Sequence, residues 1–223
     1  MKTTLIAQGL KKFIGGVVLI GILIFLPAGT LHFWHGWLLM ATLFCPIFLV
    51  GIALLLRSPE LLSKRLDPKE KEDAQKMVVA LSGLMFLASF IVAGLNFRYG
   101  WIHQPAWLTW TAVGLFLAAY LMYAEVLREN AYLSRTIEVQ EGQKVIDTGL
   151  YGVVRHPMYS ATLILFLAMP LILGSPISFL ISLLYIPIIA LRMANEERVL
   201  EEGLEGYKEY KKRVRYKVLP FIW

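Results

Sequence analysis

Long runs without a charged side chain alternate with short polar segments along this chain of 223 residues. Four of the runs contain 20 or 21 residues each: Phe13–Phe33, Trp37–Leu56, Met77–Phe97 and Pro105–Ala124. At a rise of about 1.5 Å per residue, a helix of this length crosses a hydrocarbon layer of roughly 30 Å. The pattern therefore predicts four transmembrane helices in the first part of the chain.

A fifth uncharged run, Pro157–Leu191, contains 35 residues, which is too long for one crossing. Its middle reads Gly174-Ser175-Pro176, a strong turn signal. We therefore expect a helical hairpin whose two short arms extend into the flanking polar sequence. Residues 1–223 then form a single all-α polytopic membrane domain of about six transmembrane helices. Residues 1–127 supply the N-terminal helices, and residues 128–223 supply the hairpin and a polar C-terminal tail.

The composition agrees with a helical membrane protein and excludes other classes. Apolar residues make up 57% of the chain, charged residues make up 17%, and the mean hydropathy is +0.61. Soluble domains are about 25% charged. The abundance of large aliphatic residues excludes a disordered chain, and the single Cys45 excludes a disulfide scaffold. Long apolar runs also argue against a transmembrane β-barrel, whose strands alternate apolar and polar residues.

Basic residues fall on one side of the predicted topology. The formal net charge of +6 and the pI of about 9.4 raise the question of nucleic acid binding. With six crossings, 21 of the 22 Lys and Arg residues share the side of both termini, and only Arg98 lies opposite. The positive-inside rule then predicts cytoplasmic termini, in the inner or plasma membrane of a prokaryote or the endoplasmic reticulum of a eukaryote. The basic tail, 208–217, lacks RNA-reading motifs, so we expect attraction to anionic lipid headgroups and no nucleic acid partner.

A first polar cluster, residues 149–159, directly precedes the predicted hairpin. Pro157 is suited to the first turn of a helix, because its missing N–H would be unpaired there. Arg155 and His156 would then stand just before a helix N-terminus, which favours anions.

A second polar cluster, residues 192–200, follows the hairpin. Arg192 and Glu196 are four residues apart and therefore share one helix face, with Asn195 beside them. Because the hairpin returns the chain to the same membrane side, the two clusters are predicted to meet in one polar pocket at the membrane surface.

The clusters belong to an ordered set of motifs in the last third of the chain. These motifs are Gly-Leu-Tyr at 149–151, Val-Arg-His-Pro-Met-Tyr at 154–159, Arg-x-x-x-Glu-Glu at 192–197, Tyr-x-x-Tyr-Lys-Lys-Arg-Val at 207–214 and Leu-Pro-Phe-Ile at 219–222. Over roughly residues 130–223 the set resembles the isoprenylcysteine carboxyl methyltransferase family, integral-membrane enzymes that use S-adenosylmethionine. The wider superfamily includes phospholipid N-methyltransferases and longer sterol reductases that use NADPH, and the length of this chain favours a methyltransferase.

The resemblance implies a cytoplasmic pocket for S-adenosylmethionine. The implied cofactor contacts are Gln143, Lys144, Val145, Ile146, Tyr151, His156, Pro157, Met158, Tyr159 and Glu196. Arg192 is the implied catalytic and substrate-binding residue, because its planar fork suits a carboxylate, and Asn195 is a second implied substrate contact. The eukaryotic enzymes have a His near the position of Gln143, where this chain departs from their pattern.

Each of these residues also has a simpler interpretation. Tyr151 and Tyr159 are also explained as interfacial aromatics, Arg192 as a snorkelling anchor and Glu196 as part of a solvated helix end. Three histidines fall on the opposite membrane side, His32, His35 and His103. We interpret these histidines as interfacial polar residues. His32 and His35 are three residues apart, a spacing that can bind a metal ion, but no third ligand is near them in the sequence, so we expect no metal site.

The function expected from the resemblance is methyl transfer from S-adenosylmethionine to a membrane-embedded lipophilic substrate. A methyl ester would form on a prenylcysteine-like carboxylate, and the prenylated or lipid-like substrate would enter from the bilayer. The expected partners are this substrate and membrane lipids, and no obligate protein partner is indicated. The alternatives are N-methylation of a phospholipid or other lipid, and a non-catalytic membrane protein for lipid binding or assembly. Binding of S-adenosylmethionine separates this last alternative from the other two.

Overall fold

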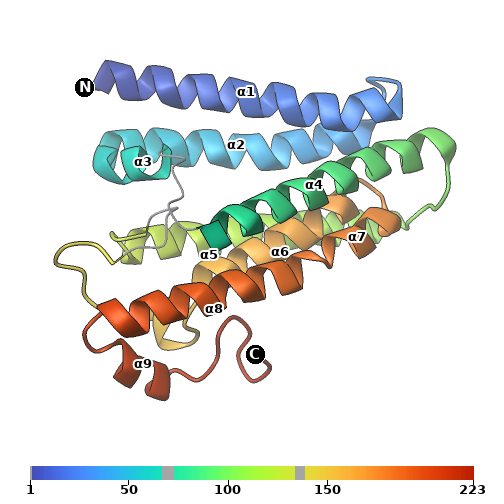
Figure 1. Ribbon diagram of the computed structural model, residues 1–223. Coiled ribbons are helices and arrows are strands. Elements are labelled where there is room, and N and C mark those ends of the chain that lie inside the picture. The colour runs from blue at the N-terminus through green and yellow to red at the C-terminus, as the bar shows by residue number, and fades with distance from the viewer. Residues whose placement is uncertain (1, 67–72, 134–138) are drawn as a thin grey trace.

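The protein is a bundle of long, roughly antiparallel helices (Figure 1). The computed structural model describes residues 2–66, 73–133 and 139–223, and these ranges contain helices and loops without a strand. In chain order the elements are α1 (Lys2–Ala28), α2 (Trp34–Arg57), α3 (Pro59–Leu66), α4 (Asp73–Tyr99), α5 (Ala106–Glu129), the 3₁₀ turn η1 (Gly149–Gly152), α6 (Pro157–Ile172), α7 (Pro176–Ser182), α8 (Tyr185–Gly203) and α9 (Tyr207–Arg213). The all-α prediction is confirmed.

Within the described ranges, five helical stretches are long and apolar enough to cross a membrane. They are Leu5–Ala28, Trp34–Arg57, Lys76–Tyr99, Ala106–Glu129 and Pro176–Gly203. The first of them begins and ends earlier than the predicted Phe13–Phe33, because the chain turns at Gly29, whose φ is +70°. The chain is therefore an integral, multi-pass membrane protein.

The hairpin forms where the sequence predicts it, but its two arms differ. Helix α6 ends at Ile172, Gly174 adopts a φ of +73°, and Ser175 caps α7 by accepting from the Ser178 amide at 3.3 Å. The second arm is broken into α7 and α8 rather than continuous. Pro187 explains the break, because it has no N–H for the Leu183 carbonyl and its ring would collide with that carbonyl.

A buried serine cluster attaches the second arm to α4. The hydroxyl of Ser178 donates to the Ser89 carbonyl at 2.9 Å, and the hydroxyls of Ser89 and Ser182 are 3.1 Å apart. Hydrogen bonds of this kind stabilise helix contacts in membranes, where apolar side chains gain little from leaving lipid.

Helix α4 approaches α1 closely at Gly94. A Cβ atom at this position would lie 2.7 Å from the Ile24 carbonyl oxygen and 2.9 Å from the Ala28 backbone nitrogen. The neighbouring Ala93 is fully buried in the same contact region. Small residues at the crossing allow the two backbones to touch, as in other membrane helix pairs.

We expect Gly94→Ala to destabilise the bundle by about 1–3 kcal/mol, because the added methyl meets backbone atoms that cannot rotate away. The matched control is Gly83→Ala in the same helix, where a Cβ would have no atom within 4 Å. Alanine there should be neutral or stabilising by up to about 1 kcal/mol, since it favours helix. Thermal unfolding in detergent compares the two variants, and equal midpoints would show that the α1–α4 contact is looser than described.

Helix α6 is the shortest of the helices that run along the bundle. Its 16 residues extend for about 24 Å, less than the roughly 30 Å of a hydrocarbon core. Figure 1 shows that α6 begins further inside the bundle than the nearby ends of α5 and α8. Met158 and Tyr159, in the first turn of α6, line a pocket together with residues of α8.

Candidate functional site

A pocket opens at the end of the bundle where α6 begins. About 850 Å³ of empty space, part of it open to solvent, lies between three parts of the chain that are distant in sequence. The lining residues are Asn130, Tyr132, Leu133, Gln143, Lys144, Val145, Ile146, Tyr151, Arg155, His156, Met158, Tyr159, Arg192, Glu196, Leu200, Leu204, Tyr207 and Tyr210.

Ten of the twelve residues that the resemblance places in the site line this pocket. Pro157 does not line it. Instead, Pro157 is the first residue of α6 and is fully buried there. Asn195 is also absent from the lining, although it lies on α8 between Arg192 and Glu196. Part of the range 136–146 (residues 136–138) lies outside the described residues, whereas 143–146 form one wall.

The wall formed by residues 143–146 follows a tight turn. Gly142 adopts a φ of +69°, and the Gln143 amide donates to the Gln140 carbonyl at 3.0 Å. The hydroxyl of Tyr132 donates to the Gly142 carbonyl at 3.0 Å, which attaches the turn to the chain that leaves α5. Residues 143–146 line the pocket as a loop, and they include two apolar side chains, those of Val145 and Ile146.

Tyr151 is fixed in the wall by two neighbours. Its phenol oxygen accepts a hydrogen bond from the Asn130 amide at 2.9 Å, and its carbonyl accepts one from the Tyr210 hydroxyl at 2.7 Å. Gly149 starts the 3₁₀ turn that carries Tyr151, with a φ of +51°. A Cβ on Gly149 would lie 2.3 Å from a carboxylate oxygen of Glu129, so glycine fits this position best.

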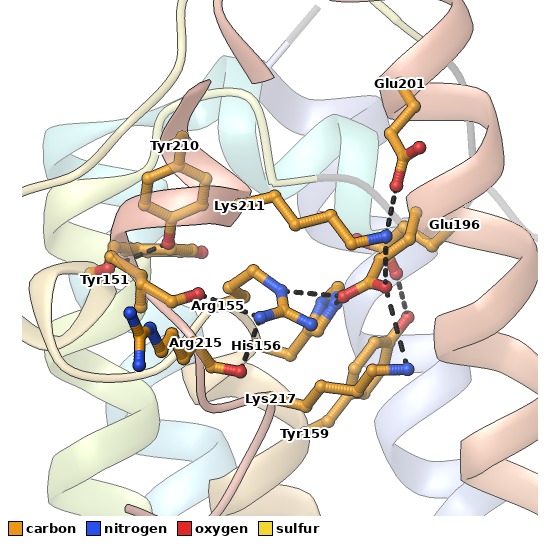
Figure 2. Close-up of polar contacts among 12 residues, drawn as sticks. Tyr151, Arg155, His156, Tyr159, Glu196, Glu201, Tyr210, Lys211, Arg215 and Lys217 are labelled. Carbon is orange, nitrogen blue, oxygen red and sulfur yellow. Dashed lines mark hydrogen bonds and ion pairs between the residues drawn. The ribbon is translucent and has the colours of Figure 1, made fainter. Parts of the chain in front are cut away.

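The centre of the polar network is Glu197. Its Oε1 atom lies 2.8 Å from Nε of Arg155 and 3.1 Å from Nε2 of His156 (Figure 2). Lys211 and Lys217 approach its Oε2 atom at 3.3 and 3.6 Å. The side chains of Arg155, His156 and Glu197 are each less than 7% exposed, so this is a buried charge cluster.

The segment 214–218 closes this cluster from the other side. The guanidinium of Arg155 donates to the carbonyls of Val214 and Arg215 at 2.8 and 2.7 Å. The backbone amides of Arg155 and His156 donate to the carbonyls of Tyr216 and Lys217 at 2.9 and 2.8 Å. The residues that precede α6 are therefore held by backbone acceptors of the C-terminal segment.

Lys211 connects the cluster to the surface. Its ammonium group donates to the carboxylate of Glu201 while it also contacts Glu197. The hydrogen bond that Lys211 donates to Glu201 raises the pKa of Lys211 above its usual range, against the effect of partial burial. Lys211 therefore stays charged at neutral pH and helps to balance the buried carboxylate.

A second polar group lies nearer the membrane, around Tyr159. The hydroxyl of Tyr159 donates to the carboxylate of Glu196 (Figure 2). The same hydroxyl accepts a hydrogen bond from Nε of Arg192 at 3.0 Å. Arg192 and Glu196 both face the pocket, as their spacing of four residues predicts. Together the three side chains form the membrane-side part of the lining.

Tyr207 is a buried lining residue whose hydroxyl has no hydrogen-bond partner within the described chain. Burial, and then the negative charges of Glu197 and Glu196, raise the pKa of this phenol far above its usual range. The hydroxyl therefore remains a hydrogen-bond donor. Buried polar groups without a partner are rare, and one that lines a pocket is available to a ligand.

Sequence reasoning did not identify Glu197 as the central carboxylate. Its spacing was informative, because Ile189, Met193 and Glu197 recur every four residues and all three are buried on one face of α8. For Arg155, the sequence predicts a position just before the N-terminus of α6 but indicates no partner for the guanidinium. Tyr207 belongs to one of the motifs, but no feature of the sequence indicates that its hydroxyl has no hydrogen-bond partner among the described residues.

Comparison with known proteins identifies relatives of this region. Residues 106–205 match a protein-family model described as phospholipid methyltransferase. The chain is also 31% identical over 91 residues to the Delta(14)-sterol reductase of Mus musculus, an alignment that covers 40% of this chain and 22% of the reductase. The matched range 106–205 contains α5, α6, α7 and α8, and with them every site residue predicted from the sequence.

Proposed function

We propose that the chain is a methyltransferase that uses S-adenosylmethionine on a lipophilic substrate in the membrane, and the match of residues 106–205 to the phospholipid methyltransferase family model supports this. One observation carries the proposal. A single pocket collects the segment 143–146, the residues around the start of α6, and Arg192 with Glu196 from α8. These segments are distant from one another in the sequence. The family resemblance implies cofactor or substrate contacts in each of them.

The lining suits the cofactor chemically. S-adenosylmethionine offers an adenine, ribose hydroxyls, an amino group and a carboxylate, and when bound it supplies a methyl group on a sulfonium. Val145 and Ile146 provide an apolar surface, Glu196 provides an acceptor, and the Tyr207 hydroxyl provides a buried donor that has no partner among the described residues. We propose that these residues hold the cofactor together with Gln143, Lys144, Tyr151, Met158 and Tyr159.

We propose that His156 contributes to the pocket from its edge. Its Nε2 atom faces Glu197, and its backbone amide is bonded to Lys217. We propose that His156 shapes the pocket floor and presents the remaining ring surface to the cofactor. Pro157 contributes by fixing the start of α6 beneath it.

Arg192 is proposed to orient the substrate. A guanidinium forms two parallel hydrogen bonds to a carboxylate, which fixes both its distance and its plane. Methyl transfer is an in-line displacement, so alignment and exclusion of water are the main contributions available to these residues. A carboxylate on a prenylcysteine-like molecule would receive the methyl group as an ester, with Asn195 on the adjoining surface of α8.

The proposed route of the substrate follows from the membrane setting. The pocket lies above the short helix α6, between longer helices, so a lipid-like molecule can reach Arg192 without leaving the apolar layer. The cofactor would enter from the polar end. Because 21 of the 22 basic residues fall on that side in the six-crossing topology, we propose that this end and both termini face the cytoplasm.

A second candidate is N-methylation of a phospholipid or another lipid amine. The description of the matching family favours this substrate class. The cofactor site would be the same, and Glu196 would then face an ammonium headgroup while Arg192 contacted its phosphate. The two candidates differ only in which substrate atom receives the methyl group.

A methyl-transfer assay with labelled cofactor tests the function directly. Purified protein in lipid nanodiscs would be offered prenylcysteine analogues, phosphatidylethanolamine and control lipids. Base-labile label on the prenylcysteine analogue supports the carboxylate proposal, and base-stable label in the phospholipid supports the second candidate. Absence of both, with no binding of S-adenosylmethionine, would contradict methyl transfer and favour a lipid-binding role or the chemistry of the sterol reductase relative.

Tyr207→Phe tests the cofactor pocket with little risk to the fold. The hydroxyl has no partner in the described chain, so its removal should leave the unfolding midpoint unchanged or slightly higher. A lost neutral hydrogen bond of about 0.5–1.5 kcal/mol should weaken S-adenosylhomocysteine binding by roughly 2- to 12-fold in calorimetry. Tyr216→Phe, outside the pocket lining, is the control. Unchanged affinity in Tyr207→Phe would remove this residue from the proposed site.

A further inference from the structure

Helices α1, α2 and α3 lie together at one edge of the bundle (Figure 1), and an apolar groove runs between them. The groove contains about 1,150 Å³ of empty space, part of it open to the surroundings. Of its fourteen lining residues, thirteen are aliphatic, aromatic or glycine, and the remaining one is Lys12. The lining shares no residue with the pocket at the start of α6. A large apolar groove with one cation suits an amphipathic ligand that carries negative charge.

The length of the groove corresponds to one leaflet of a membrane. On α2 the lining extends from Phe44 to Leu55, which is about 17 Å of helix. Half of a hydrocarbon core is about 15 Å thick. The lining ends shortly before Arg57, the last residue of α2. One acyl chain can therefore lie in the groove from the membrane surface towards the midplane.

Lys12 enters this groove well below the end of α2. The adjacent Phe13 packs against Phe44 and Phe48, with ring centroids 5.6 and 5.4 Å apart. Phe48 precedes Arg57 by nine residues, which is about 14 Å along the helix. A cation at this level of a membrane helix is costly unless it is paired or its long side chain reaches the headgroup layer.

The partner of Lys12 leaves its charge uncompensated. Its ammonium group donates to the carbonyl of Leu66, the last residue of α3. This carbonyl is a dipole without a net charge, and the ranges that the structure describes contain no ion pair of Lys12. An ammonium has three N–H donors, so one bond to Leu66 does not exhaust them. The adjacent Lys11 is exposed and adds a second positive charge to the same part of α1.

We propose that the groove binds one anionic phospholipid, with an acyl chain between α1 and α2 and its phosphate beside Lys12. The phosphate supplies the negative charge that Lys12 lacks, and the acyl chain covers the apolar lining. Gly51 keeps the groove open, because a Cβ at this position would have no atom within 4 Å. The assignment concerns helices outside the candidate site and does not depend on the proposed methyl transfer.

Photolabelling of the full chain in neutral detergent micelles tests the assignment. The probe is a phosphatidylglycerol with a diazirine on one acyl chain, and mass spectrometry would map the labelled peptides. Unlabelled dioleoylphosphatidylglycerol, dioleoylphosphatidylcholine and sodium phosphate would compete with the probe in separate titrations. The three competitors distinguish an anionic lipid from a zwitterionic lipid and from a free anion.

Two variants change the groove, and each has a matched control. Lys12→Gln removes the charge but keeps an N–H donor for the Leu66 carbonyl, and Lys212→Gln removes an exposed charge from α9. Gly51→Phe fills the groove, and Gly114→Phe makes the same change in α5, where a Cβ also has no atom within 4 Å. Both control positions lie outside the groove lining. Unfolding midpoints of all variants would be measured in the same detergent.

In wild type we expect label on α1 and α2 beside the groove. Phosphatidylglycerol should compete at about 5-fold lower mole fraction than phosphatidylcholine, the contribution of one Lys near anionic headgroups. In Lys12→Gln this ratio should fall to about 1, and Gly51→Phe should lose most of the label. Both control variants should behave as wild type.

Equal competition by the two lipids in wild type, or a preference that persists in Lys12→Gln, would overturn the assignment. Displacement of the probe by sodium phosphate would do the same, because it would indicate a site for a free anion. Label on the basic segment 208–217 instead of α1 and α2 would also contradict it. If the unfolding midpoint shows that Gly51→Phe does not fold, Lys12→Gln still decides the question.

Discussion

Replacing Glu197 with alanine is expected to lower the free energy of unfolding by about 3–5 kcal/mol. The substitution leaves the buried guanidinium of Arg155 without its carboxylate and removes the acceptor that faces His156. An uncompensated buried charge is far more costly than the loss of an exposed ion pair. The expected decrease in the unfolding midpoint is roughly 6–20 °C for a chain of this size.

The matched control is Glu202→Ala, one and a half turns further along α8. Glu202 contacts Arg198 at 4.0 Å on the exposed surface, and pairs of this kind contribute less than about 1 kcal/mol. Thermal unfolding of both variants in detergent, followed by intrinsic tryptophan fluorescence, makes the comparison. Equal midpoints for Glu197→Ala and Glu202→Ala would mean that Arg155 is solvated rather than buried as described here.

The second large effect is expected on catalysis. Arg192→Lys keeps a positive charge but loses the planar fork that fixes a carboxylate in two dimensions. Loss of a charge-assisted hydrogen bond of about 1.5–3 kcal/mol should reduce turnover of an acid substrate by roughly 10- to 150-fold. Affinity for the cofactor should change little, because Arg192 is not among the proposed cofactor contacts.

The control for this variant is Arg198→Lys, on the same helix but outside the pocket lining. It should retain both turnover and cofactor affinity. If Arg192→Lys abolished cofactor binding while turnover at saturating cofactor survived, Arg192 would belong to the cofactor site. If it changed neither quantity, the side chain would be a snorkelling anchor at the membrane boundary.

Local signals in the sequence predicted the parts of the fold that depend on neighbouring residues. Gly174-Ser175-Pro176 predicted the hairpin turn, and Pro157 predicted the start of α6, because both act through the backbone of their own segment. Pro187 carried an equally local signal for the break between α7 and α8, and only the uniform hydrophobicity around it concealed that break.

The contacts that build the pocket are not local and left weaker signals. Glu196 and Glu197 are adjacent and chemically identical, and only the helical phase of α8 decides which of them is buried with Arg155. The partners of Arg155 in the segment 214–218 are backbone carbonyls, which every sequence possesses. No residue type at those positions indicates that they accept these hydrogen bonds. The motif resemblance therefore named ten residues that line one pocket, whereas their individual partners depend on contacts between distant segments.

The closure of the charge cluster by residues 214–218 has a consequence for biosynthesis. Every apolar helix leaves the ribosome before this segment, so the bundle can enter the membrane while Arg155 still lacks three of its backbone acceptors and His156 lacks one. Pairings between distant segments form late, because the chain between them must be ordered first. Insertion and competence for ligand binding are thus separated in time. A nascent chain arrested before Val214 should already be embedded in the bilayer, yet only the completed tail can convert it into a binding-competent protein.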